Sequence, residues 1–269
     1  MDKSHLTARL SDSRTSARRW RRNRRSRKRA EALTALVEEL LPAEHDVSGD
    51  HDAWPLVGAG LLSRATSTLR VFDAGRGEQS VDAATLGRSL YEHILHLAWL
   101  GADPSPARLQ EWRKADLVQR LKADNDARTV GVQLLHDAAR ARMQAQVAAM
   151  TGNDLVLPNL AIAADKHWAG KLPAMGGHRE LGSFKGLYVV LYRNYSAIAH
   201  PSHIGLNHVV EDISDIRKRV VLEKPPEGRG PFGMATVVYA LGLYVAGHSL
   251  GWPSVERVTA AFDRYPGLA

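Results

Sequence analysis

The sequence predicts an all-α protein, a multi-helix bundle that carries a disordered, arginine-rich arm at its N-terminus. Apolar residues recur at helical spacing through most of the chain, which favours a bundle of amphipathic helices. The stretch 81–100 is apolar on nearly every side, which is typical of a central helix. Nine of the twelve residues in 18–29 are Arg or Lys, and like charges at helical spacing oppose a helix unless a polyanion neutralises them. We therefore assign residues 1–29 to the arm and 30–269 to the helical domain.

The apolar spacing and the positions of Gly and Pro divide the domain into successive elements. The predicted helices cover 30–41, 52–72, 81–100, 106–123, 127–150, 160–168, 183–199, 233–249 and 254–264. Two short β-like runs, 208–210 and 219–223, indicate a small β-hairpin near 208–223. The Gly-x-Gly-x-x-Gly letters at 228–233 contain Pro231 and no parallel strand follows, so a loop is favoured over a dinucleotide site.

The net charge of +7 is unevenly distributed. Residues 1–29 contain twelve Lys or Arg and two acidic residues, a net charge of +10, so the remaining 24 basic and 27 acidic residues carry a net charge of −3. The arm is therefore the predicted contact for nucleic acid, with RNA favoured over DNA. An anionic lipid surface, an acidic protein or a solubilising role are the alternatives. The basic residues concerned are Arg18, Arg19, Arg21, Arg22, Arg24, Arg25, Arg27, Lys28 and Arg29.

The composition also bears on the compartment. The chain of 269 residues contains no cysteine, which excludes disulfides and thiolate zinc sites and favours a reducing compartment, the cytoplasm. No apolar segment follows the N-terminal charges, so a secretory signal is not indicated. The stretch Met234–Gly251 is interrupted by Gly and His and is expected to fall short of a membrane span.

The helix 183–199 carries the main candidate site. On a helical wheel with about 100° per residue, Phe184 and Leu191 mark a core face, and Arg193, Ser196 and His200 share the opposite one. Such a set suits RNA cleavage without a metal or another cofactor. The His200 imidazole would take the proton from a 2′-hydroxyl, and the Arg193 guanidinium would stabilise the charge of the phosphorane. Asn194 and Ser196 would position the phosphate.

The segment from Arg193 to His200 resembles the R-x(4–6)-H motif of the HEPN superfamily, helical proteins that include many prokaryotic toxin and defence ribonucleases. A polar residue directly after the Arg, as Asn194 is here, is common in that motif. The resemblance implies a metal-independent endoribonuclease or RNA-processing protein in defence or stress response. It also implies a homodimer, because sites of this kind are often shared between two copies.

A second resemblance covers more of the chain. The R-S-L-x-E helix from Arg88 to Glu92 and the Y-R-N-x-S-x-x-x-H-P-S segment from Tyr192 to Ser202 are similar to a bacterial domain family of unknown function, over roughly 50–220. Arg88 and Glu92 lie one helical turn apart, so an ion pair that links two helices is one interpretation. A supporting role, in which Glu92 orients His200 or Arg193, is the other. It requires contact between 81–100 and 183–199.

Three classes of function stay open. The first is the HEPN-like ribonuclease, and the second is a non-catalytic helical module that binds nucleic acid or a partner. The third is a sensor in which the helices 81–100 and 183–199 line a pocket. A metal site is disfavoured, because the order Glu92-His93-x-x-His96 differs from that of a zinc-binding H-E-x-x-H helix.

Overall fold

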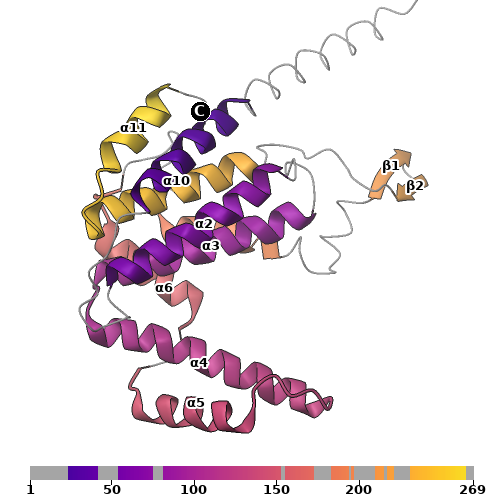
Figure 1. Ribbon diagram of the computed structural model, residues 1–269. Helices are drawn as coiled ribbons and strands as arrows, with labels where there is room; N and C mark the ends of the chain where they lie inside the picture. Colours follow the sequence, from indigo (N-terminus) through magenta and orange to yellow (C-terminus); the bar gives the residue numbers. More distant parts are fainter. Residues whose placement is uncertain are drawn as a thin grey trace, which may run out of the picture.

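Helix α3 (Val81–Ala102) lies at the centre of the computed structural model, where it packs against α2 (Trp54–Ala74), α10 (Pro231–Ser249) and α6 (Leu157–Trp168) (Figure 1). This arrangement confirms the predicted all-α class. It also confirms that the helix with apolar residues on nearly every side is the central one, since only neighbours on several sides can cover such a surface.

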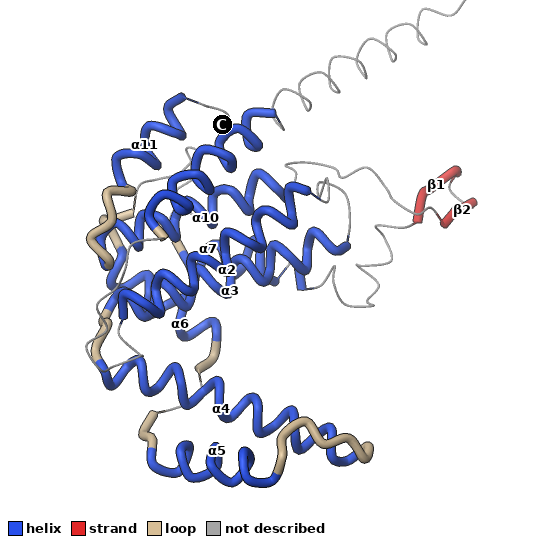
Figure 2. The backbone as a smooth tube through the Cα atoms, in the orientation of Figure 1, coloured by secondary structure: helices blue, strands red, loops and turns tan. Residues whose placement is uncertain are grey.

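The structure describes residues 24–41, 54–74, 81–152, 155–172, 183–193, 195–196, 210–214, 217–220 and 231–264. Figure 2 shows the course of the backbone. The elements beyond the central four are a helix over 24–40, α4 (Pro106–Thr129), α5 (Asp137–Ala149), α7 (Phe184–Leu187), the π-helical segment η3 (Tyr188–Tyr192), strands β1 (Val210–Ser214) and β2 (Arg217–Val220), and α11 (Val255–Arg264).

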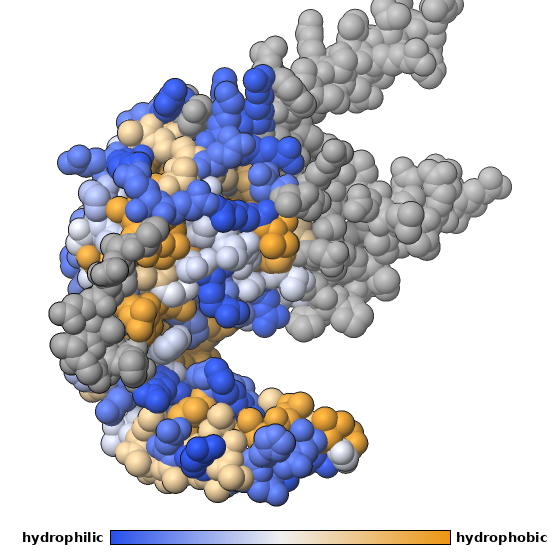
Figure 3. All heavy atoms as spheres, in the orientation of Figure 1, coloured by the Kyte–Doolittle hydropathy of each residue, from blue (hydrophilic) through white to orange (hydrophobic). Residues whose placement is uncertain are grey.

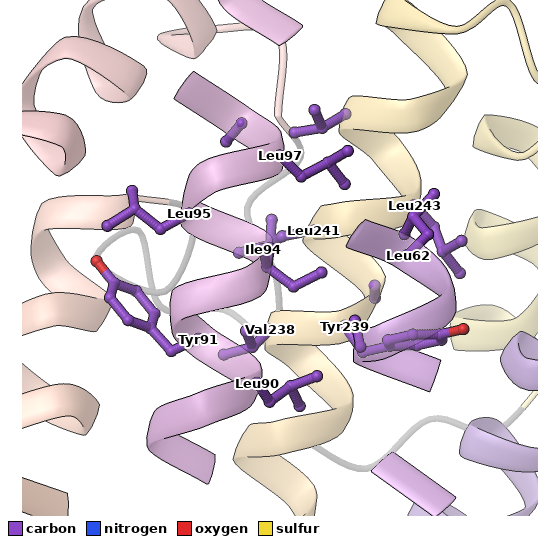
Figure 4. Packing of buried hydrophobic residues seen from close by; sticks show 14 of the residues in the cluster. Leu62, Leu90, Tyr91, Ile94, Leu95, Leu97, Val238, Tyr239, Leu241 and Leu243 are labelled. Atoms are coloured by element: carbon purple, nitrogen blue, oxygen red, sulfur yellow. The ribbon is translucent and has the colours of Figure 1, made fainter. Parts of the chain in front are cut away.

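Apolar side chains of α3 and α10 pack against each other in the core (Figure 4). Gly242 permits this approach, because a Cβ atom there would lie 2.3 Å from Ile94 Cδ1. Two hydrogen bonds join polar groups inside the core: the Trp168 indole N–H donates to the Ala98 carbonyl over 2.9 Å, and the hydroxyls of Thr66 and Tyr239 are 2.6 Å apart. The apolar contacts and these hydrogen bonds together fix the position of α3.

Helix α10 was expected to be too interrupted for a membrane span, but its segment Phe232–Ser249 meets the length and hydropathy of one. Most of that segment, 72%, is buried inside the structure. A core helix of a globular domain has the same composition, because its neighbours cover it on every side.

The first described helix corrects the predicted boundary of the arm. Residues 24–29 were assigned to a disordered arm, yet they belong to the helix over 24–40. Arg27 forms an ion pair with Asp73 of α2 over 3.1 Å, and Arg29 is only 2% exposed, with its guanidinium 4.0 Å from the Phe262 ring centroid. Burial lowers the pKa of Arg29 to about 10. This part of the helix is therefore stabilised by contacts with Asp73 and Phe262, which are remote in sequence, and not by a bound polyanion.

These contacts reduce the number of basic residues in 24–29 that are available to bind nucleic acid. Arg27 and Arg29 face the body of the protein, whereas Arg24, Arg25 and Lys28 lie on the exposed side of the helix. The remaining basic residues of the predicted arm, Arg18, Arg19, Arg21 and Arg22, lie outside the described residues.

The connection between α4 and α5 differs from the prediction, which began the second helix at residue 127. Helix α4 instead continues to Thr129, and a loop over 130–136 precedes α5. Gly131 in this loop has φ +80°, a backbone conformation that favours glycine. The backbone N–H groups of Leu134 and Leu135 donate to the carboxylate of Asp124, over 3.0 and 2.8 Å. This carboxylate takes the place of the helical bonds that the loop lacks.

Strands β1 and β2 pair antiparallel, with Val210 opposite Val220 and Asp212 opposite Lys218. The register shifts between Asp212 and Ser214. The bounds differ from the predicted runs, since β1 begins where the first run was expected to end.

Candidate functional site

Arg88 and Glu92 lie on α3, which contacts η3, and Arg193 directly follows η3. On α3, Arg88 Nε donates to Glu92 Oε1 over 3.1 Å, and the two side chains are 34% and 33% exposed. The Arg88 guanidinium also lies over the Tyr192 ring, 5.0 Å from its centroid. The ion pair is therefore within one helix, and Arg88 makes the contact to the second segment that a supporting role requires.

The close contacts among Arg88, Glu92 and Tyr192 shift the pKa values of Arg88 and Tyr192. Burial acts to lower the pKa of Arg88, but the hydrogen bond to Glu92 and the nearby Tyr192 raise it above its usual value. Burial also raises the pKa of Tyr192; the Glu92 carboxylate raises it further, and the Arg88 charge opposes this increase. At neutral pH the site thus presents a cation beside a protonated phenol.

The start of α7 is held from two sides. Asp165 of α6 accepts hydrogen bonds from the Ser183 hydroxyl and from the backbone N–H groups of Phe184 and Lys185, over 2.8, 2.6 and 2.9 Å. The Tyr91 hydroxyl of α3 donates to the Phe184 carbonyl over 2.8 Å. A carboxylate at this position satisfies N–H groups that have no partner within the helix. These contacts fix the origin of the segment that carries Tyr192 and Arg193.

We expect Asp165→Ala to lower the free energy of unfolding by about 2 kcal/mol, because three hydrogen bonds to one carboxylate are lost at a helix start. Urea denaturation followed by circular dichroism measures this change. Lys166→Ala, an exposed position on the same helix, is the control and should change stability by less than about 0.5 kcal/mol. Equal effects of the two substitutions would show that the cap has no structural importance.

The π-helical segment corrects the predicted placement of Ser196. The Arg193 N–H donates to the Tyr188 carbonyl, five residues back, so one extra residue is accommodated in this turn. The residues that follow are rotated by about 100° relative to a regular α-helix. Ser196 was expected on the side opposite the core, but it is half-buried and its Oγ is buried. Its hydroxyl lowers the pKa of Tyr192, although no well-aligned hydrogen bond joins the two.

Aromatic rings contribute to the contact between α3 and the η3 region. Tyr188 and Tyr192 are stacked, with centroids 5.3 Å apart and planes 17° apart, and Tyr91 of α3 contacts Tyr192 at 5.7 Å. Tyr195 lies against Gly87, where a Cβ atom would be 2.4 Å from Tyr195 Cε2. Burial raises the pKa of Tyr195 well above its usual value and thus keeps it protonated. The missing side chain at Gly87 therefore determines how closely the segment approaches α3.

Of the two residues with predicted catalytic roles, the structure describes Arg193 but not His200. Arg193 is exposed, and no described residue forms an ion pair with it. It directly follows Tyr192 in the chain, at the C-terminal end of η3. Asn194 and His200 lie outside the residues whose side chains are described.

The histidines of α3 are neutral at pH 7. Burial lowers the pKa of His96 to about 4, although the Glu92 charge opposes the shift. Burial and the Arg64 charge lower the pKa of His93. Within the described part of the chain, no three His, Asp or Glu side chains are placed to hold a metal ion. Neutral imidazoles at these positions add no positive charge to the site.

Sequence reasoning missed several residues that shape this site: Tyr91, Gly87, Asp165 and Tyr192. Tyr192 precedes the Arg of the motif, and this proximity was the available signal. The other three act through contacts between segments far apart in the chain, for which a single sequence carries no signal.

The model of a family of unknown function, DUF5677, matches residues 57–217, which is more than half of the chain. The chain belongs to the DUF5677 family. This result confirms the resemblance to an uncharacterised domain family and nearly reproduces its predicted extent. No curated protein and no solved structure matches the chain.

The DUF5677 region contains α3, η3 and the whole candidate site, but it ends before α10. The helix that packs most closely on α3 therefore comes from outside the matched region. In this DUF5677 chain, the site is positioned by residues on both sides of that boundary.

Proposed function

We propose that this protein is an HEPN-like, metal-independent endoribonuclease or RNA-processing protein whose site lies where η3 meets α3. One observation supports the proposal: the Arg88–Glu92 pair of one motif contacts Tyr192 of the other, directly beside Arg193. Arg88 is thus brought to Tyr192, more than 100 positions away in the sequence, so two segments that contact each other supply two arginines and a phenol. A cluster of this composition suits a phosphodiester better than a neutral ligand.

The chemistry assigns one role to each residue. His200 takes the proton from the 2′-hydroxyl, whose oxygen attacks the adjacent phosphorus as the bond to the 5′ oxygen breaks. The leaving oxygen takes a proton from water, and the products are a 2′,3′-cyclic phosphate and a free 5′-hydroxyl. Arg193 stabilises the charge on the phosphorane, and Arg88, held by Glu92, adds a second cation. Asn194 positions the phosphate.

The proposal also covers how RNA is held, the compartment of the protein and its oligomeric state. The basic N-terminal residues hold RNA through its phosphates, without sequence preference. The absence of cysteine fits a cytoplasmic protein. A role in defence or stress response and a shared site in a homodimer follow from the HEPN resemblance.

The test is cleavage of labelled RNA in the presence of EDTA. We expect the wild-type chain to cleave, and His200→Ala and Arg193→Ala each to lower the rate by about 10²–10⁴-fold. Arg120→Ala, which removes an exposed ion pair on α4, is the matched control and should cleave at the wild-type rate.

Two outcomes would contradict this function. Cleavage that EDTA abolishes would indicate a metal-dependent or contaminating nuclease. RNA binding without cleavage, equal in all variants, would instead favour the non-catalytic binding module.

A further inference from the structure

Helices α4 and α5 form an antiparallel hairpin that extends away from the body of the protein (Figure 1). Of the 24 residues of α4, only Leu109, Leu117 and Asp124 are buried, and none of the 13 residues of α5 is buried. Leu109 belongs to the main core, so the projecting part buries a single apolar side chain of α4. Helices of this length depend on tertiary packing for stability. A partner would supply burial that the body of the protein does not.

The tip of the hairpin, residues 130–136, is apolar and exposed (Figure 3). Val130, Val132 and Leu134 are 76%, 50% and 59% exposed, and they lie within five residues of one another. The backbone that displays them is fixed, because Asp124 accepts the N–H groups of Leu134 and Leu135. Large apolar side chains gathered on a fixed loop are typical of an interaction surface.

The side of α5 that faces away from α4 is rich in alanine and carries two charged residues, Asp137 and Arg142. The half-buried positions of the helix mark the side that faces α4, and the residues opposite them are all exposed. These exposed residues are Asp137, Ala138, Ala141, Arg142, Ala145, Ala148 and Ala149. A solvated helix face usually carries several charged side chains. We call this face, together with the tip, the hairpin surface.

Four of the five alanines are arranged symmetrically about Met143, since Ala138 and Ala148 are equally distant from it, as are Ala141 and Ala145. We propose that the hairpin surface binds a second copy of this chain, with the two α5 helices antiparallel about a two-fold axis near Met143. Ala138, Ala141, Ala145 and Ala148 then each lie opposite an alanine of the second copy, Ala149 lies opposite Asp137, and the axes can approach to about 8 Å. A two-fold interface requires such a self-complementary pattern, whereas an unrelated partner does not.

The antiparallel helix dipoles favour a second copy as the partner, and the area of the interface limits the affinity of the dimer. Arg142 would lie opposite Gln144 of the second copy, and the antiparallel helix dipoles attract. Helix α5 is about 20 Å long, so the helix pair and the two tips together stay below the roughly 1,200 Å² of a standard interface. We therefore expect a weak dimer with a dissociation constant in the micromolar range or above. This inference does not depend on the proposed catalytic function, because the hairpin surface lies on other helices.

The first experiment is sedimentation velocity of the full chain from about 1 to 200 μM. The average mass should rise with concentration toward that of a dimer. A141E/A145E places like charges opposite each other twice and should remain monomeric. A141K/A145E places opposite charges at the same positions and should dimerise again, although both variants carry two charged residues and good helix formers.

The second experiment uses the absence of cysteine in the chain. We expect a mixture of the single variants A141C and A145C to form a disulfide-linked dimer faster than either variant alone, since these positions lie opposite each other only in the antiparallel register. Circular dichroism confirms that each variant is folded.

Three results would overturn the proposal. The first is a chain that stays monomeric at the highest concentration. The second is a dimer that A141E/A145E leaves intact, which would place the interface elsewhere. The third is a monomer that binds neutral phosphatidylcholine vesicles and loses this binding in V132D, which would assign the tip to a lipid surface.

Discussion

Asp124→Ala is expected to disorder the tip of the α4–α5 hairpin. The carboxylate is fully buried and accepts hydrogen bonds from the side chains of Arg128 and Arg140, over 2.8 and 2.6 Å, in addition to two backbone N–H groups of the tip. Without it, two arginines lose their common partner and the loop has no acceptor for its N–H groups. Hydrogen exchange at Leu134 and Leu135 should accelerate by roughly a hundredfold or more.

Asp126→Ala is the control for this prediction, because Asp126 is an exposed carboxylate one half-turn away on the same helix. Its exchange pattern should match the wild type. The global unfolding transition should be nearly the same in both variants, since the hairpin contributes little to the core. Unchanged exchange at the tip of Asp124→Ala would show that the loop is held by other contacts.

The same group predicts how the tip responds to pH. Burial acts to raise the pKa of Asp124, but the N–H of Leu135 and the side chains of Arg128 and Arg140 outweigh it and hold the pKa well below its usual range. A lowered pKa stabilises the folded form at every pH above the usual value of about 3.9. The tip should therefore stay ordered at neutral and mildly acidic pH and open only as the pH falls through the lowered value.

Gly87→Ala should destabilise the protein, although alanine is the better helix former. The new Cβ atom would lie 2.4 and 2.7 Å from two atoms of the Tyr195 ring, so α3 and the η3 region must move apart. Overpacking of this kind costs about 1–3 kcal/mol, which exceeds the gain of about 1 kcal/mol in helix propensity. The free energy of unfolding from urea denaturation measures the net loss.

Gly60 of α2 provides a matched comparison, because it is exposed and a Cβ atom there would meet no other atom within 4 Å. Gly60→Ala should stabilise the protein by up to about 1 kcal/mol. If Gly87→Ala stabilises it equally, the close contact between α3 and Tyr195 is not maintained in solution. Under the proposed function, Gly87→Ala should also slow RNA cleavage, because it displaces the segment that carries Arg193.

Much of the helical framework was predictable because it follows from burial. The residues of α3 are apolar on nearly every side, and only a central helix satisfies them. The loop over 130–136 was missed for the converse reason: Val130, Val132 and Leu134 are apolar but exposed, so they resemble part of a core face. Residues 24–29 were misassigned because their partners, Asp73 and Phe262, are remote in sequence.

The candidate site was predictable in its residue types but not in its geometry. Arg88, Glu92 and Arg193 follow from spacing and motif, and Arg88 and Glu92 do form an ion pair. The orientation of Ser196 does not follow, because a single π-helical turn shifts the phase of all later residues and has no compositional signature. An extra residue in one turn is thus enough to move a hydroxyl from the expected solvent side to a buried position.

The helix over 24–40 also affects when the fold is completed. Glu39 forms a two-bond ion pair with Arg257, which follows it by 218 residues, and Arg29 contacts Phe262 of the same helix, α11. At about 5–20 residues per second, the ribosome needs roughly ten to forty seconds to supply these partners. During that interval the basic helix of the nascent chain lacks its contacts with α11. A segment that is synthesised about 220 residues before its partners is therefore among the last to reach its final position.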